Sequence, residues 1–237
     1  MTVVIPALNE ENAVGQVLAE IPADIVDSVI VVDNASTDRT PEVARAAGAT
    51  VVHEPQRGYG AACLRGIASV PEETTIIVFL DADHSDFPTD MHLLVDPILH
   101  SDADFVLGSR ILGERESGAM LPQAFWGNKL AVTLIREIWG HRYTDLGPFR
   151  AIRADALEQL AMRDRDYGWT IEMQIRAVEE GLRVLEHPVR YRRRIGKSKI
   201  SGTLSGTIRA GAKILYTIGR HAARRSARNR DRSNKSG

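Results

Sequence analysis

The sequence predicts an α/β protein in which helices cover both faces of a mostly parallel sheet. Through the first half of the chain, short runs rich in β-branched residues alternate with segments of helical hydrophobic spacing. This alternation is typical of strand–helix–strand units, which place their strands in parallel. One run, at residues 76–80, is continuously apolar, as expected for a central strand covered on both faces. The 237 residues are enough to bury such a sheet.

The first half of the chain supplies most of the expected strands. Runs dominated by Val, Ile and other apolar residues predict strands at residues 2–6, 28–33, 50–54, 75–81 and 105–110. The intervening segments predict helices at residues 9–21, 37–47 and 59–68. Val14, Val17 and Leu18 lie at helical spacing in the first, and Pro41 lies in the first turn of the second, where proline is tolerated. Ligands are expected beyond the carboxyl ends of such strands.

The second half of the chain is less regular. Helices are expected at residues 121–139, 155–162 and 170–180, the last ending at Gly181. Residues 183–194 form either a strand pair or one bent strand, because Pro188 interrupts the run. We therefore expect a main domain at residues 1–200, a basic amphipathic helix at 201–225 and a disordered, polar tail at 226–237.

Charge is divided unevenly along the chain. The first 189 residues contain 15 Lys and Arg and 30 Asp and Glu, whereas residues 190–237 contain 15 Lys and Arg and one acid. The two parts therefore carry net charges of −15 and +14. The basic end is expected to meet an anionic surface or ligand, while the acidic body argues against a broad nucleic-acid-binding face.

Cysteine content and hydropathy bear on localisation. Cys63 is the single cysteine, so an intrachain disulfide is excluded and a reducing compartment is favoured. We recognise neither a secretory leader nor a run of roughly 20 apolar residues. The expectation is a cytoplasmic protein that can dock peripherally on the inner face of the membrane.

Two acids follow the most apolar strand. In FLDADHSDFP, Asp81 and Asp83 stand at i and i+2 directly after the apolar run, so both point the same way and repel each other. A hard divalent cation, Mg²⁺ or Mn²⁺, relieves this repulsion and is often shared between one or two carboxylates and a substrate diphosphate. The alternative is a solvated turn with a helix cap. The position at a strand end favours the metal site.

Two further motifs lie near the same predicted edge. Asp33 ends the second strand and can accept a hydrogen bond from a base or ribose hydroxyl, although, taken alone, an Asx turn or helix N-cap explains it better. RGYGAACLRG (57–66) follows the third strand and lacks the third glycine of a dinucleotide fingerprint, which argues against a dehydrogenase. Arg57 is then placed near a phosphate or base, or simply at a glycine-rich helix start.

The basic end has two parts, each with two interpretations. YRRRIGKSKISG (191–202) supplies Arg194, Lys197 and Ser198, which suit a phosphate group or a solvated basic loop. The helix at 201–225 is either interfacial on a membrane or packed on the domain. If it is interfacial, removing the chain after Gly202 should abolish contact with a lipid and leave ligand binding at the sheet edge intact.

Taken together, the motifs resemble glycosyltransferase family 2, and most of all its dolichol-phosphate mannose synthase-like branch. The segments that carry the resemblance are IPALNEE (5–11), VVDNASTDRT (31–40), RGYGAACLRG (57–66), FLDADHSDFP (79–88), GSR (108–110), TDLGPFRAIR (144–153) and HPVRYRRRIGKSK (187–199). One departure is Gly147-Pro148, where members of the family have a Ser-Gly-Phe-like turn. The sugar and acceptor pocket is therefore expected to differ.

The resemblance implies a GT-A (Rossmann-like) fold and a metal-dependent, inverting glycosyltransferase. The donor would be a GDP- or UDP-sugar and the acceptor a polyprenyl phosphate. By motif, the nucleotide would contact Pro6, Ala7, Asn9, Glu11, Asp33, Arg57 and Asp81. Asp81 and Asp83 would hold Mg²⁺ or Mn²⁺, and the acceptor phosphate or donor diphosphate would face Arg110, Arg194, Lys197 and Ser198. Asp83, Asp145, Glu172 and Arg110 are the expected catalytic residues, with Asp145 or Glu172 positioning the sugar or acting as a base.

Two alternatives remain open at this stage. A soluble family 2 enzyme would use the same donor with a hydroxyl acceptor, and a non-catalytic protein would bind the nucleotide sugar without turnover. Neither the sugar nor the oligomeric state follows from the residues.

Overall fold

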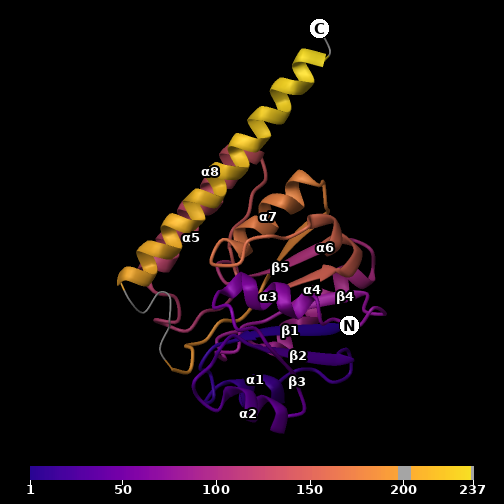
Figure 1. Cartoon of the computed structure of the whole chain (residues 1–237), viewed down its shortest axis with the longest axis vertical. Coiled ribbons are helices and arrows are strands. Elements are labelled where there is room, and N and C mark those ends of the chain that lie inside the picture. The colour runs from indigo at the N-terminus through magenta and orange to yellow at the C-terminus, as the bar shows by residue number, and fades with distance from the viewer. Residues whose placement is uncertain (197–203, 236–237) are drawn as a thin grey trace.

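The computed structural model describes residues 1–196 and 204–235, and in this part of the chain the strands form one seven-stranded sheet (Figure 1). The strand order is β3-β2-β1-β4-β6-β5-β7. The strands are β1 (Thr2–Ala7), β2 (Ser28–Asp33), β3 (Thr50–His53), β4 (Ile76–Phe79), β5 (Phe105–Ser109), β6 (Arg150–Arg153) and β7 (Val184–Pro188). β6 alone among them runs antiparallel to its neighbours. The predicted α/β class with a mostly parallel sheet is confirmed.

Helices flank this sheet on both faces (Figure 1). They are α1 (Val14–Ala19), α2 (Thr40–Ala46), α3 (Tyr59–Ile67), α4 (Met91–Leu99), α5 (Pro122–Trp139), α6 (Ala154–Leu160), α7 (Trp169–Glu179) and α8 (Leu204–Lys235). A short 3₁₀ turn, Pro88–Asp90, precedes α4. Helix α1 starts later than expected, because Asn9 adopts a left-handed backbone conformation with φ 54° and the chain is not helical there.

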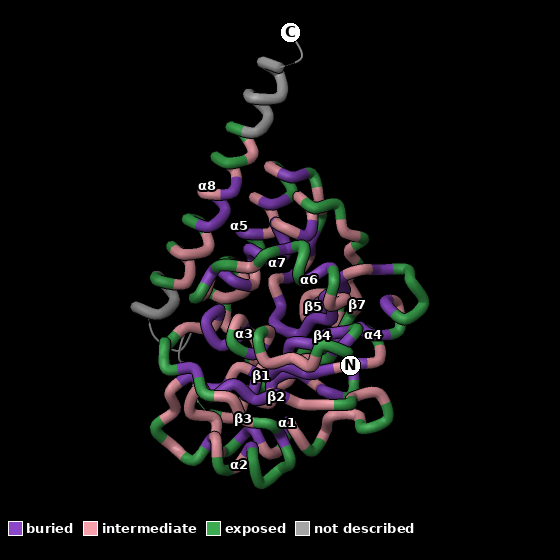
Figure 2. The backbone as a smooth tube through the Cα atoms, turned by 45° about the vertical axis from the view of Figure 1, so that its right-hand side comes forward, coloured by how far each residue is buried: buried purple, intermediate pink, exposed green. Residues whose placement is uncertain are grey.

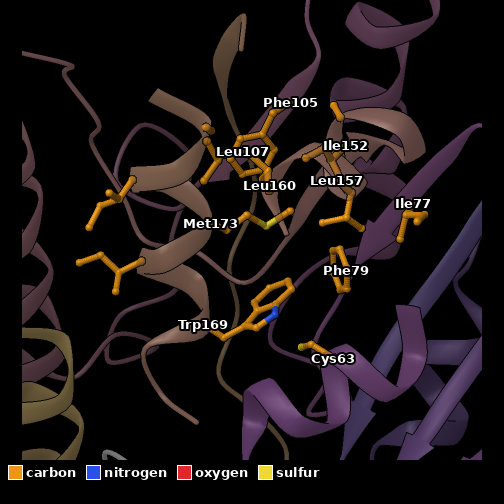
Figure 3. Close-up of a cluster of buried hydrophobic side chains, with 14 of the residues drawn as sticks. Cys63, Ile77, Phe79, Phe105, Leu107, Ile152, Leu157, Leu160, Trp169 and Met173 are labelled. Atoms are coloured by element: carbon orange, nitrogen blue, oxygen red, sulfur yellow. The ribbon is translucent and has the colours of Figure 1, made fainter. Parts of the chain in front are cut away.

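Alternate residues of the central strands supply two cores. Ile77 and Phe79 of β4 pack into the cluster under α3, α5, α6 and α7, while Ile76 and Val78 pack into the one shared with α1, α2 and α4. Figure 3 shows Phe79 facing Trp169 of α7, with ring centroids 4.7 Å apart. The central strands are buried along their length (Figure 2). The apolar run of β4 is therefore covered on both faces, as predicted.

Two elements were not foreseen from the sequence. β6 (RAIR) carries an arginine at each end, and Arg150 is nevertheless fully buried. A four-residue strand with charged ends gives no apolar run to detect. Helix α4 contains Pro97, which weakens the helical signal.

The C-terminal half also departs from expectation at its end. β7 ends at Pro188, and the following residues leave the sheet toward its carboxyl edge, where Tyr191 bridges to Asp86. Helix α8 lies along α5 (Figure 1) and continues to Lys235, so residues 226–235 are helical where the sequence favoured a disordered tail. None of the helices in the described residues combines the length and apolar character that crossing a bilayer requires.

Candidate active site

A cavity of about 490 Å³ opens at the carboxyl ends of β1 and β4. Five groups of residues line it: residues 6–10 after β1, Asn34 after β2, residues 57–59 with Ala62 at the start of α3, residues 81–83 after β4, and the later residues Asp166, Tyr167, Arg194 and Arg209. The cavity therefore lies at the sheet edge where the sequence predicted the binding crevice.

Asp81 and Asp83 both face this cavity. The Tyr59 hydroxyl donates to Asp81 Oδ1 at 3.1 Å. Burial, together with the charge of Asp83, raises the pKa of Asp81 to about 7. On Asp83, Oδ1 accepts hydrogen bonds from the backbone N–H and the hydroxyl of Ser85, at 2.9 and 2.5 Å. The geometry thus keeps two close carboxylates that repel each other.

This donor set fits a hard divalent cation. Carboxylate oxygens are the ligands that Mg²⁺ and Mn²⁺ prefer, and a cation would relieve the repulsion between Asp81 and Asp83. Within the described residues, no group of three or more His, Cys, Asp or Glu side chains is arranged to hold a metal ion. A bound ion would therefore need its remaining ligands from substrate oxygens and water, as is common for Mg²⁺ with diphosphates.

Arg194 reaches into the cavity beside these acids. Its guanidinium lies 2.7 Å from Glu10 and 3.0 Å from Asp83 Oδ2. The backbone holds it there, because Ile195 N–H donates to the Asp83 carbonyl and Arg192 N–H donates to the Ser85 carbonyl, each at 2.9 Å. The basic segment is thereby attached directly to the loop that carries the two aspartates.

Arg110 and Asp145 form a second charged unit, which does not line the cavity in the described structure. Asp145 is fully buried and accepts two side-chain hydrogen bonds from Arg110, both at 2.8 Å, and one from the Arg110 backbone N–H at 2.9 Å. Burial alone would raise the pKa of Asp145, but the charge and hydrogen bonds of Arg110 outweigh it and hold the pKa below its ordinary value.

Asp86 is a further buried acid close to this unit. Both of its carboxyl oxygens lack a hydrogen-bond partner among the described residues. Burial and the charge of Asp81 raise the pKa of Asp86 well above its ordinary value, while Arg110 acts in the opposite direction. No pattern in the sequence separates Asp86 from the other acids of the motif.

The expected nucleotide-binding residues divide into two groups. Pro6, Ala7, Asn9 and Arg57 line the cavity. Asp33 and Glu11 are outside its lining and support the loops around it. Asp33 accepts hydrogen bonds from Ser36 N–H at 3.0 Å and pairs with His53 at 2.9 Å, and Glu11 accepts from Arg39 N–H at 3.0 Å.

The structure does not place Glu172 near the expected chemistry. It is fully buried in α7, does not line the cavity, and accepts hydrogen bonds from the backbone N–H groups of Arg163 and Asp164 at 3.0 and 2.6 Å. Arg176 donates to its other oxygen at 3.2 Å. These contacts hold the backbone that precedes α7, and the role of Glu172 in positioning the sugar or acting as a base stays a prediction. Lys197 and Ser198 fall outside the described residues.

Sequence reasoning missed other residues of the cavity. Tyr59, Asp166, Tyr167 and Arg209 all line it. Tyr59 lies within RGYGAACLRG. Its position after a predicted strand, at the start of the next helix, is the sequence signal that could have placed it at the cavity. The other three reach the cavity through tertiary packing, which no local pattern reports.

Comparison with known proteins gives a consistent picture. The model of the family described as "Glycosyl transferase family 2" matches residues 2–161. An uncharacterized glycosyltransferase of Mycobacterium tuberculosis is 40% identical over 213 residues, covering 88% of this chain and 93% of the relative. A dolichyl-phosphate hexose transferase of Haloferax volcanii is 31% identical over 209 residues, covering 87% of this chain and 89% of the relative.

Solved structures show the same fold. Glucosyl-3-phosphoglycerate synthase of Mycobacterium tuberculosis, in complex with Mn²⁺, uridine diphosphate and glucosyl-3-phosphoglycerate, is similar with a TM-score of 0.73 and 26% sequence identity. The similarity covers 92% of this chain and 79% of the synthase chain.

Proposed function

This chain belongs to glycosyl transferase family 2, and from that premise we propose that it transfers a sugar from a GDP- or UDP-sugar to a polyprenyl phosphate, with inversion at the anomeric carbon. The observation that carries the proposal is the pair of carboxylates, Asp81 and Asp83, facing a cavity beside the cation of Arg194. Such a combination suits the diphosphate of an activated sugar, because it offers both a metal-binding pair and a fixed positive charge.

Each residue has a role that its position supports. Asp81 and Asp83 would hold Mg²⁺ or Mn²⁺, which offsets charge on the departing diphosphate. The Mn²⁺ and uridine diphosphate in the structure of the similar synthase support this assignment. Arg194 would leave Asp83 and Glu10 to contact a phosphate group. Arg57 and the backbone at Pro6 and Ala7 would hold the nucleotide.

The acceptor determines whether a base is needed. A polyprenyl phosphate already carries an anionic oxygen, so the enzyme has only to position it and offset its charge. Arg110 would serve that purpose, and Asp145 would orient its guanidinium through the two 2.8 Å hydrogen bonds. A hydroxyl acceptor would instead need a proton acceptor, for which Asp145 is the candidate because Arg110 keeps its carboxylate ionised, although the lowered pKa also makes it a weaker base.

The comparisons support both acceptors. The dolichyl-phosphate hexose transferase supports the lipid phosphate, and glucosyl-3-phosphoglycerate synthase supports a soluble hydroxyl acceptor as the second candidate. We place the lipid acceptor first because of an exposed apolar surface on α5 and α8. Trp126 and Leu130 of α5 are 62% and 50% exposed, and Leu215 and Tyr216 of α8 are 46% and 62% exposed. The two helices lie side by side (Figure 1).

This surface, defined as Trp126, Leu130, Leu215 and Tyr216, has the composition of a membrane interface. Lys129 lies 5.2 Å from the Trp126 ring centroid, and Lys213 lies 5.9 Å from that of Tyr216. Aromatic side chains beside cations are favoured where acyl chains meet anionic headgroups. The +14 charge of residues 190–237 adds attraction to an anionic bilayer. Peripheral docking on the inner face of the membrane follows from the proposal.

We expect the purified chain to bind UDP or GDP and the matching nucleotide sugar in a metal-dependent way. A ligand that binds only the folded state raises the free energy of unfolding, by about 2.7 kcal/mol when its concentration is 100 times its Kd. The melting temperature rises as a result. A thermal-shift screen of nucleotide sugars with Mn²⁺, then with EDTA, measures this directly. Turnover with the best donor then separates an enzyme from a binding protein. No shift with any nucleotide would contradict the proposed donor site.

We also expect the chain to sediment with anionic liposomes. Replacing both Trp126 and Tyr216 with Ala should weaken partitioning at least about tenfold, because each ring can bury 150 Å² or more at roughly 25 cal/mol/Å². Leu99→Ala on α4 is the matched control, since Leu99 is 61% exposed and lies outside the surface. Sedimentation unaffected by the double substitution would favour the soluble acceptor.

A further inference from the structure

Part of the cavity wall comes from a loop that joins two helices and does not follow a strand. The α6–α7 loop, residues 161–168, contributes Asp166 and Tyr167 to the cavity lining. Helix α8 contributes Arg209 to the same lining. The donor cavity is therefore closed by two elements that lie far along the chain from Asp81 and Asp83.

The loop packs closely against the start of α3. Ala61 N–H donates to the Arg165 carbonyl at 2.8 Å. A Cβ at Gly58 would lie 2.2 Å from the Arg165 carbonyl oxygen, and one at Gly60 would lie 2.1 Å from that of Asp164. Only glycine permits this approach. One side of the loop is thus fixed by the glycines of the RGYGAACLRG motif.

The other side of the loop packs against α8. Lys213 Nζ lies 2.9 Å from Asp164 Oδ2, and the Asp164 side chain is only 2% exposed. The remaining oxygen of Asp164 accepts the backbone N–H of Asp166 at 2.9 Å. One buried carboxylate therefore connects α8 to the backbone of a residue that lines the cavity. A Cβ at Gly168 would lie 2.5 Å from both Asp164 Oδ2 and Thr217 Oγ1, so this packing is close as well.

A second buried acid strengthens the same contact. Glu172, which holds the Arg163 and Asp164 backbone N–H groups, lies 3.6 Å from the Arg220 guanidinium and 3.9 Å from His221 Nε2. Basic residues of α8 thus face two buried carboxylates on the body. Ile214 and Ile218 of the same helix pack into the core beside them. Helix α8 is therefore held against the body by both polar and apolar contacts.

We propose that α8 is a component of the donor site: the Lys213–Asp164 ion pair holds the α6–α7 loop against α3, and Arg209 adds a cation for the nucleoside diphosphate. Lys213 is then a positioning residue and Arg209 a binding residue. The inference rests on the proposed donor site and deepens it. It replaces the expectation that removal of the chain after Gly202 leaves donor binding intact, because that removal would take away both residues.

The test measures the affinity of the full-length chain for the nucleoside diphosphate that binds it most tightly, UDP or GDP, with Mn²⁺ in calorimetry. Lys213→Ala should weaken nucleotide binding by roughly tenfold, with KM for the donor sugar raised and kcat nearly unchanged. Lys213→Arg should restore affinity, because it keeps the ion pair with Asp164. Arg224→Ala is the matched control, since Arg224 is an exposed cation on the same helix. It should bind like the unaltered chain.

Arg209→Ala keeps the inference falsifiable if Lys213→Ala does not fold. Arg209 is exposed and its loss leaves the Lys213–Asp164 contact intact, and we expect roughly tenfold weaker binding of the diphosphate from the loss of one charged contact. Unchanged affinity in both Lys213→Ala and Arg209→Ala would overturn the inference while leaving the proposed function standing. Failure of the unaltered chain to bind any nucleotide would overturn the proposed function itself.

Discussion

Asp83→Asn is expected to abolish metal-dependent sugar transfer while leaving the chain folded. The substitution removes a charged ligand from the proposed metal-binding pair, and loss of one group that stabilises developing charge costs about 10²–10³ in rate. The fold should survive because the Asn side-chain oxygen can still accept from Ser85 N–H and its hydroxyl. Arg194 is partly exposed and keeps its 2.7 Å contact with Glu10.

Steady-state turnover over a range of Mn²⁺ concentrations measures the effect, with circular dichroism as the check on folding. Asp24→Asn is the matched control, because it makes the same chemical change at a carboxylate whose side chain is 69% exposed. That control should keep full activity. Wild-type turnover in Asp83→Asn would mean that Asp83 does not hold the ion.

The sequence was informative about the sheet edge because the relevant signals are local. The apolar run at residues 76–80 predicts a strand covered on both faces. The residues that directly follow this strand in the sequence must lie at the carboxyl edge of the sheet. Local pattern therefore places Asp81 and Asp83 at this edge, whereas the residues after β1 follow only from the family resemblance. The fold class followed from the same alternation of strands and helices. β6 escaped because four residues with an arginine at each end give no apolar run.

The site was harder to predict where tertiary packing decides it. In the sequence Glu172 is an acid on a helix, and no pattern distinguishes a buried acid that holds two backbone N–H groups from one that contacts a substrate. Lys213 and Arg209 look like solvated cations of a basic helix. Their roles depend on Asp164 and on the glycines at the start of α3, which are remote in sequence and adjacent only in the folded chain.

The donor and acceptor assignments also differ in what supports them. Asp81, Asp83 and Arg194 share one cavity, whereas Arg110 and Asp145 form a buried ion pair outside its lining. Charged groups with low exposure are costly unless each is paired. The pair is therefore expected to contribute to folding as well as to acceptor binding, and its removal is expected to lower the stability of the chain.

Asp145→Ala is expected to destabilise the chain by about 3–5 kcal/mol, because it leaves the Arg110 guanidinium with low exposure and without its partner. Asp145→Asn should cost less, since its side-chain oxygen can still accept from Arg110. Chemical denaturation measures both. Glu137→Ala is the control, because the Arg136–Glu137 pair is 50% and 62% exposed and should contribute within about 1 kcal/mol.

The same ion pair predicts an acid dependence with a definite sign. The pKa of Asp145 is lower in the folded chain than its ordinary value of 3.8, so the unfolded chain binds the proton more tightly. The stabilisation by Asp145 is then complete above that ordinary value and is lost as the pH falls through the lowered one. Asp145→Asn cannot titrate, so the difference in unfolding free energy between it and the unaltered chain should shrink as the pH is lowered below about 4. A difference that stays constant between neutral and strongly acidic pH would show that Asp145 does not owe its stabilising effect to its charge.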